Sequence, residues 1–272
     1  MTSVSSVGNV KCPMTNDKLI PNYLIIIIII FIHLIFVICN LSFAFTFAVF
    51  GDNRDGEETF KQILKQLNAD PPAFAVNTGD FVSRGSKAEY EHYIKLIKGA
   101  KFKVYNVMGN HDEVYGGGKW FAKYFGPDHY SFDYENSHFI VLNNAFKGDF
   151  DKKQYDWLVA DLKKNYGKNI FVCFHKPIFD PSETYPNYVM SERKTGQELM
   201  ELFKRYKARY VFTGHIHGYA RAEREGVVYI VTAGAGAPLY LPRWMGGFNH
   251  YVKMKVEDDK ITEEVIKINE SH

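Results

Sequence analysis

The stretch from Lys103 to Asp112 reads KVYNVMGNHD and decides the fold. An apolar run of strand length leads into Gly109, where it gives way to an amide, an imidazole and a carboxylate. Branched and aromatic residues favour a strand, and a glycine behind them favours a turn. We therefore predict a buried strand over residues 103–107 that delivers polar side chains at its carboxyl end.

Four other apolar runs along the chain end in the same way. The polar clusters behind them are Gly51-Asp52-Asn53-Arg54, Gly79-Asp80, His175 and Gly214-His215-Ile216-His217. The carboxyl ends of parallel strands line the ligand crevice of an open α/β sheet. We therefore expect all five clusters to meet at one site.

Amphipathic segments lie between these runs and predict helices. Their ranges are 57–67, 86–97, 151–166 and 195–206. A hairpin is predicted around Glu135-Asn136-Ser137, and further strand pairs turn at Glu225-Gly226 and at Asp258-Asp259. Strands that alternate with helices are typical of an α/β fold.

The composition excludes some classes of function. The chain has 272 residues, 46% of them hydrophobic, with a net charge of +2, which suits one sizeable domain and a tail. A near-neutral chain without a basic run does not predict a nucleic-acid partner, and this disfavours a nuclease. The folded part keeps a single cysteine, Cys173, so cysteine content does not reveal the compartment.

The N-terminal segment predicts export from the cytoplasm. Residues 24–39 are almost wholly apolar, and Ser42 and Ala44 follow in the pattern of a signal-peptidase site. One interpretation is a signal peptide cleaved after Ala44, and the other is an uncleaved membrane anchor that tethers the protein through residues 24–39. Either way, residues 1–44 are a targeting segment and residues 45–272 are the functional domain. We expect that domain to be extracytoplasmic, as a secreted, periplasmic or membrane-anchored protein.

The residue types in the five clusters indicate metal chemistry. Carboxylate, amide and imidazole donors without a thiolate suit Mn, Fe or Zn. A central aspartate can bridge two cations at the spacing used for phosphoryl hydrolysis.

The ordered series of clusters resembles the calcineurin-like metallophosphoesterase family, which is related to the purple acid phosphatases, over nearly all of residues 45–268. The resemblance implies an α/β four-layer αββα sandwich, in which two mixed sheets are flanked by helices. It also implies hydrolysis of a small-molecule phosphomonoester, phosphodiester or nucleotide by a metal-bound hydroxide.

The family pattern also implies a role for each matching residue. Two divalent or trivalent ions, Mn, Fe or Zn, are expected. Asp80 would bridge them, Asn110, His175 and His215 would complete one metal site, and Asp52 and His217 would hold the other. His111 would act on the scissile phosphate as general acid or charge stabiliser, oriented by Asp112.

Arg54 departs from the family pattern, which has a histidine ligand at this position. A guanidinium has no free lone pair and cannot bind a metal ion. Arg54 is therefore expected either to hold the substrate phosphate or to mark a weak or empty site. The second possibility leaves open an alternative function, a non-catalytic interaction module that retains the fold with a weakened metal site.

Overall fold

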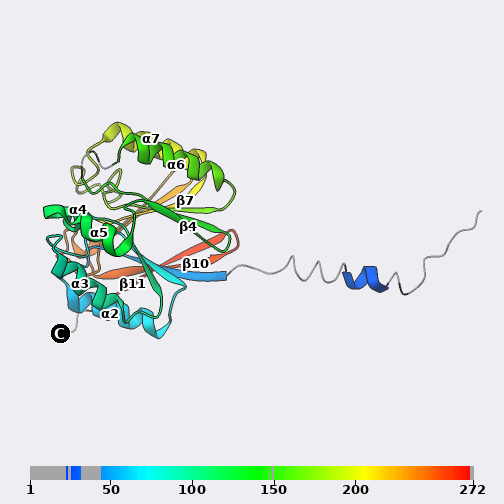
Figure 1. The fold of residues 1–272 in the computed structure, drawn as a ribbon, viewed down its shortest axis with the longest axis horizontal. Coiled ribbons are helices and arrows are strands. Elements are labelled where there is room, and N and C mark those ends of the chain that lie inside the picture. The colour runs from blue at the N-terminus through cyan, green and yellow to red at the C-terminus, as the bar shows by residue number, and fades with distance from the viewer. Residues whose placement is uncertain (1–22, 24–25, 32–43, 147, 149, 270–272) are drawn as a thin grey trace, which may run out of the picture. The chain divides into compact units, whose positions relative to one another are not determined.

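The computed structural model describes residues 23, 26–31, 44–146, 148 and 150–269 (Figure 1). The chain divides into two compact units, residues 1–42 and 43–272. In the first unit Tyr23 and residues 26–31 are helical and exposed. Among the described residues, no helix combines the length and apolarity that a membrane crossing requires. Most of the predicted targeting segment lies outside the described residues, so cleavage or anchoring stays a prediction.

The second unit contains two mixed β-sheets. The first sheet has the strand order β11-β10-β1-β2-β3. Strands β1 to β3 run parallel, and β10 and β11 are antiparallel additions at one side. The bounds are β1 Ala44–Phe50, β2 Phe74–Asn77, β3 Lys103–Asn106, β10 His250–Glu257 and β11 Lys260–Lys267.

The second sheet has the order β4-β5-β6-β7-β9-β8. Its four central strands are parallel, and the two edge strands β4 and β8 pair antiparallel with their neighbours. The bounds are β4 Tyr130–Tyr134, β5 Ser137–Val141, β6 Asn169–Cys173, β7 Ala208–Thr213, β8 Tyr219–Arg224 and β9 Val227–Thr232.

Helices cover the outer faces of both sheets. Figure 1 shows α2 and α3 beside the first sheet and α6 and α7 beside the second. Their bounds are α2 Glu57–Ala69, α3 Lys87–Ile97, α6 Lys152–Lys164 and α7 Arg193–Arg205. The αββα sandwich that the sequence predicted is therefore confirmed.

Strand β1 is apolar on both faces, so one face can pack against the second sheet and the other against helices. Phe45, Phe47 and Val49 pack into the core between the sheets. Ala48 and Phe50 point the other way, into the core formed with α2 and α3. Side chains alternate across a strand, so an unbroken apolar run buries both faces of its sheet.

Two short helices follow β3 that the sequence analysis did not predict. These are α4 over Asn110–Glu113 and α5 over Gly118–Phe125, with a 3₁₀ turn over Val114–Gly116 between them. Three consecutive glycines, residues 116–118, lead into α5 and supply its first residue, and glycine has low helix propensity. Burial of Phe121 against the outer core of the first sheet outweighs that propensity.

Candidate metal centre

Six predicted ligands leave the carboxyl ends of five strands and meet between the sheets. The first sheet contributes three of them and the second sheet the other three. They are Asp52 after β1, Asp80 after β2, Asn110 after β3, His175 after β6, and His215 and His217 after β7.

Three of these residues have an unusual backbone conformation. Asp52, Asp80 and His215 have φ angles of 57°, 56° and 71°. Residues other than glycine rarely occupy this left-handed region, and where they do, the surrounding structure holds them there, often at functional sites. The left-handed turn bends the chain at each strand end and directs the side chain inward.

Glycines beside the ligands allow this close approach. A Cβ atom on Gly109 would collide with the carboxylate of Asp80, and one on Gly214 would collide with the carboxylate of Asp52. Only glycine lets another side chain approach its backbone so closely. This explains physically why a glycine precedes both Asn110 and His215.

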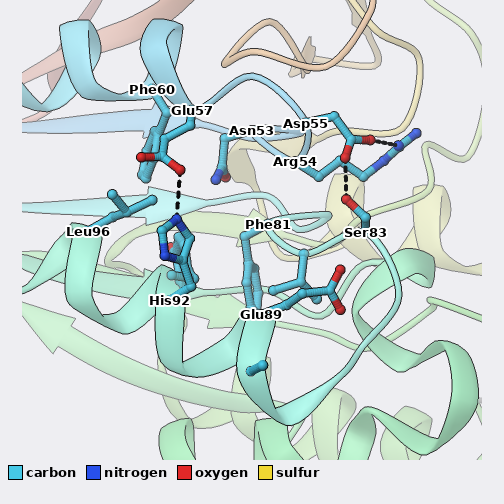
Figure 2. Close-up of a pocket in the computed structure, with 13 residues that line it drawn as sticks. Asn53, Arg54, Asp55, Glu57, Phe60, Phe81, Ser83, Glu89, His92 and Leu96 are labelled. Carbon is cyan, nitrogen blue, oxygen red and sulfur yellow. Dashed lines mark hydrogen bonds and ion pairs between the residues drawn. The ribbon is translucent and has the colours of Figure 1, made fainter.

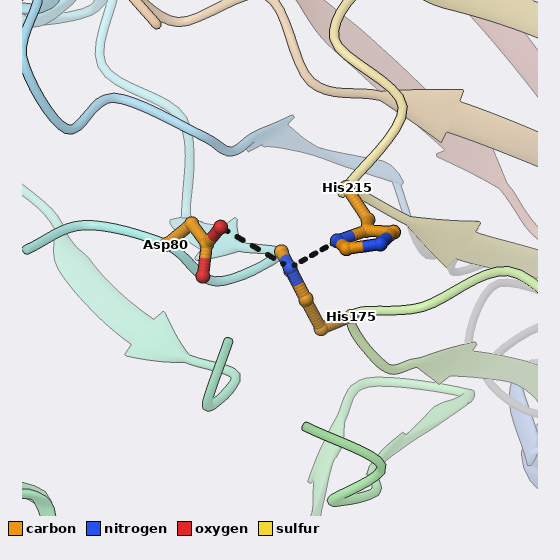
Figure 3. A group of neighbouring side chains, drawn as sticks. All are labelled: Asp80, His175 and His215. Atoms are coloured by element: carbon orange, nitrogen blue, oxygen red, sulfur yellow. Dashed lines mark hydrogen bonds and ion pairs between the residues drawn. The ribbon is translucent and has the colours of Figure 1, made fainter. Parts of the chain in front are cut away.

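The first candidate group is centred on His175. Its Nε2 lies 3.4 Å from Asp80 Oδ2, 3.2 Å from Asn110 Oδ1 and 3.3 Å from His215 Nδ1. Figure 3 shows Asp80 and His215 on either side of the His175 ring. The Nδ1 atom donates to the carbonyl oxygen of Thr78 at 2.9 Å, which turns Nε2 toward this cluster. One ring nitrogen carries at most one hydrogen, so Nε2 cannot form hydrogen bonds to all three neighbouring atoms at once. The lone pairs of these oxygen and nitrogen atoms therefore converge as they would around a cation.

The second candidate group contains Asp52 and His217 and shares Asp80 with the first. His217 Nε2 lies 3.3 Å from Asp52 Oδ1, and its Nδ1 donates to the carbonyl oxygen of Pro238 at 2.6 Å. The His and Asp ligand atoms in each group lie within 4.8 Å of one another. Histidine ligands are commonly oriented in this way by a carbonyl on the second ring nitrogen. The residues therefore fit a pair of cations with oxygen and nitrogen ligands.

Burial and neighbouring charges shift the pKa values of three residues in the centre. Burial opposes ionisation of Asp80, but the charge and hydrogen bond of His175 hold the pKa of Asp80 below its usual range. Burial likewise disfavours the imidazolium of His175, yet Asp80 and Asp52 raise the pKa of His175 to about 9. Burial and the neighbouring His175 lower the pKa of His215 to about 2. The two carboxylates thus favour a proton on His175.

Asp112 has a different position from the one expected. Its carboxylate accepts the backbone N–H groups of Asp80, Phe81, Val82 and Gly109. Within the described part of the chain it makes no hydrogen bond or ion pair with the imidazole of His111. His111 is oriented instead by Ser83, whose carbonyl oxygen accepts from Nδ1 at 2.9 Å. Asp112 therefore shapes the loop that carries Asp80.

Arg54 lies beside the shared carboxylate. Its Nε is 3.7 Å from Asp80 Oδ2, and its Nη1 is 2.7 Å from Asp55 Oδ2. The Nε atom is buried and has no hydrogen-bond partner among the described residues. A fixed positive charge therefore borders the Asp52, Asp80 and His217 group.

Ser83 and Pro238 were not identified from the sequence as contributors to the site, and Tyr240, expected only at the rim of the pocket, has a more specific role. Ser83 orients His111, Pro238 orients His217, and Tyr240 stacks on the His217 ring with centroids 4.0 Å apart. Two of them act through backbone carbonyls, which every residue possesses, so residue type carries no information about these roles. Tyr240 comes from a loop after β9 that has no metal-binding motif.

The chain is similar to known phosphoesterases. The family model for calcineurin-like phosphoesterases matches residues 45–219. Purple acid phosphatase 22 of Arabidopsis thaliana is 28% identical over 57% of this chain and 34% of its own length. A 3',5'-cyclic-nucleotide phosphodiesterase of Nostoc sp. is 26% identical over 64% of this chain and 67% of its own length. The chain thus spans about a third of the plant relative.

A solved structure with the same fold is the purple acid phosphatase from yellow lupin. It superposes with a TM-score of 0.70 at 17% identity, over 83% of this chain and 52% of that one. This likeness supports the two-sheet architecture.

The proton on His175 predicts that metal uptake depends on pH. Mn²⁺ affinity of the metal-free, full-length chain should rise between about pH 6 and pH 9, because the His175 proton must leave before Nε2 can bind a cation. The apparent affinity should change by up to about tenfold per pH unit. Titration calorimetry at several pH values measures this slope.

The exposed His92, outside the centre, provides a control. His92→Gln should leave the slope unchanged. An affinity that stays constant between about pH 7 and pH 9 would contradict the assignment of the proton to His175.

Proposed function

This chain belongs to the calcineurin-like phosphoesterase family, and we propose that it is a metal-dependent phosphoesterase acting on a small phosphomonoester, phosphodiester or nucleotide. The observation that carries the proposal is the pair of His/Asp groups that share Asp80. A shared carboxylate places two cations close enough to act on one phosphoryl group.

Each ligand has a defined part in this proposal. Asp80 would contact both ions, Asn110, His175 and His215 would complete one site, and Asp52 and His217 would hold the other. When bound, the cations supply positive charge to the phosphoryl oxygens and make a hydroxide nucleophile available near neutral pH.

His111 is suited to act on the ester itself. Its backbone N–H donates to Asp80 Oδ1 at 2.8 Å, and its Nδ1 hydrogen is held by the carbonyl of Ser83. The half-buried ring therefore keeps Nε2 for the substrate. From this position Nε2 can donate a proton to the oxygen that leaves phosphorus, or stabilise the charge that forms there.

Arg54 is suited to bind a phosphoryl oxygen. The guanidinium is held by Asp55, and Asp55 is held in turn by the hydroxyl of Ser83. The guanidinium carries further N–H groups beyond the one given to Asp55, and these remain donors for an anion. Because guanidinium groups form strong bonds with phosphate, Arg54 compensates for the missing histidine by holding the substrate.

A direct test is hydrolysis by the full-length chain loaded with Mn²⁺, Fe³⁺ or Zn²⁺. We expect turnover of p-nitrophenyl phosphate or its bis ester. Asp80→Ala should abolish turnover and lower metal content at both sites, because it removes the shared ligand. Asp156→Ala on α6, an exposed carboxylate away from the centre, should change neither quantity. A chain that binds metal and hydrolyses no ester would favour the interaction-module alternative.

A change at His111 should separate catalysis from metal binding. His111→Gln should keep both metals and slow turnover by roughly 10²–10⁴-fold, the typical cost of losing a general acid. The loss should be smaller for esters with acidic leaving groups, because these need less protonation. Metal analysis and kinetics on one preparation measure metal content and turnover. Loss of metal in this variant would indicate that His111 is a metal ligand.

Changes at Arg54 should separate substrate binding from metal binding. Arg54→Ala should raise KM by about 10- to 100-fold, the value of a charge-assisted hydrogen bond. Arg54→His should also raise KM but tighten the second metal, because it adds an imidazole ligand and removes a repelling charge. Arg84→Ala removes an exposed guanidinium and serves as the control. Unchanged KM and metal affinity in both Arg54 variants would rule out this role.

A further inference from the structure

Tyr240, on the loop between β9 and β10, lies against one ligand of the candidate centre. Its ring is nearly parallel to the His217 ring, at 20°, with the two centroids 4.0 Å apart. The backbone N–H of Tyr240 also donates to the carbonyl oxygen of His217 at 2.9 Å. Together with the hydrogen bond from His217 Nδ1 to Pro238, these contacts fix the Tyr240 side chain beside the second candidate group.

The loop after β6 also holds Tyr240 in place. The Tyr185 hydroxyl donates to the carbonyl oxygen of Tyr240 at 2.9 Å. The backbone N–H of Tyr185 donates in turn to the buried carboxylate of Asp180 at 2.6 Å. The ring of Tyr188 lies edge to face with the Tyr240 ring, with centroids 5.7 Å apart. Tyr240 is therefore held by two loops that leave different strands of the second sheet.

The charges around the second candidate group act on the Tyr240 hydroxyl. Burial raises the pKa of this phenol, and the charges of Arg54, Asp52 and Asp80 also act on it. Arg54 reaches the group from the wall of a cavity of about 450 Å³ between α2 and α3, where Asp55 holds its guanidinium (Figure 2). Tyr240 reaches the same group from the loop after β9. The guanidinium and the phenol therefore approach one group from different sheets of the sandwich.

The Tyr240 hydroxyl makes no hydrogen bond within the described part of the chain, because the bond from Tyr185 uses the Tyr240 backbone carbonyl. Packing on the His217 ring requires only an aromatic ring, and phenylalanine would provide one without a polar group to satisfy. A hydroxyl in this position can therefore serve a bound molecule that occupies the centre.

A phosphoryl group suits this hydroxyl. A protonated phenol donates one hydrogen bond, and phosphoryl oxygens are strong acceptors. Arg54 already supplies positive charge beside Asp80. An uncharged donor adds a further hydrogen bond to the substrate without adding a charge that would repel a cation at Asp52.

We propose that the Tyr240 hydroxyl donates a hydrogen bond to a phosphoryl oxygen of the substrate at the second candidate group. Tyr240 is then a substrate-binding residue as well as a support for His217. This inference rests on the proposed function, because it assigns a further role at the same site. Its test measures binding and does not depend on turnover.

Inorganic phosphate provides that test because it carries phosphoryl oxygens and no ester. The full-length chain loaded with Mn²⁺ should bind phosphate in titration calorimetry. Tyr240→Phe keeps the ring on His217 and removes the hydroxyl, so it should weaken phosphate binding by at least about tenfold and leave metal content unchanged. Tyr240→Ala also removes the ring, so it should lower metal content as well.

Tyr166→Phe is the matched control. Tyr166 is 58% exposed and precedes β6, so it lies at the opposite end of that strand from His175. Removing its hydroxyl should change neither phosphate affinity nor metal content.

The Tyr240 proposal and the proposed function fail in different ways. Equal phosphate binding by wild type and Tyr240→Phe would overturn the Tyr240 proposal, as would the absence of phosphate binding by the loaded wild type. Loss of metal from Tyr240→Phe would also overturn it, because the hydroxyl would then be a metal ligand. Phosphate binding that depends on the hydroxyl, without hydrolysis of any ester, would overturn the proposed function and support the Tyr240 proposal.

Discussion

Four backbone N–H groups converge on the carboxylate of Asp112 and join the end of β2 to the end of β3. Phe81 and Val82 donate to Oδ1, and Asp80 and Gly109 donate to Oδ2. A fully buried carboxylate is costly unless hydrogen bonds replace its water, and here both oxygens are satisfied. The same bonds hold the left-handed backbone of Asp80, so the position of the shared carboxylate depends on Asp112.

Neither sheet contains the centre by itself. Asp52, Asp80 and Asn110 follow strands of the first sheet, and the three histidines follow strands of the second. The distances between their donor atoms therefore depend on how the sheets stack. Aromatic rings fill that interface, where Phe47 meets Phe139 and Phe171 edge to face at 5.1 Å each. A metal ion held by residues of both sheets would link the sheets. Metal binding would therefore raise the free energy of unfolding.

Arg54 alters the charge balance of this centre. Its guanidinium lies beside Asp80 and is held by Asp55, so positive charge is present there before any cation binds. Such a charge attracts an anionic phosphoryl group and disfavours a metal ion at the same carboxylate.

Local sequence was sufficient for the strands and the convergence of the ligands, and the family resemblance added the αββα sandwich. Apolar runs ending in glycine and a polar ligand depend on neighbours in the chain, and parallel strands bring their carboxyl ends together whatever the detailed packing. Helix α5 was missed because burial of Phe121 outweighs three glycines. The roles of Asp112 and Ser83 were decided by tertiary structure, since they depend on how the loop after β2 folds back on β3. The cavity between α2 and α3 was decided in the same way, because its lining combines residues of α2, α3 and the loop after β2, which become neighbours only when both helices pack on one sheet.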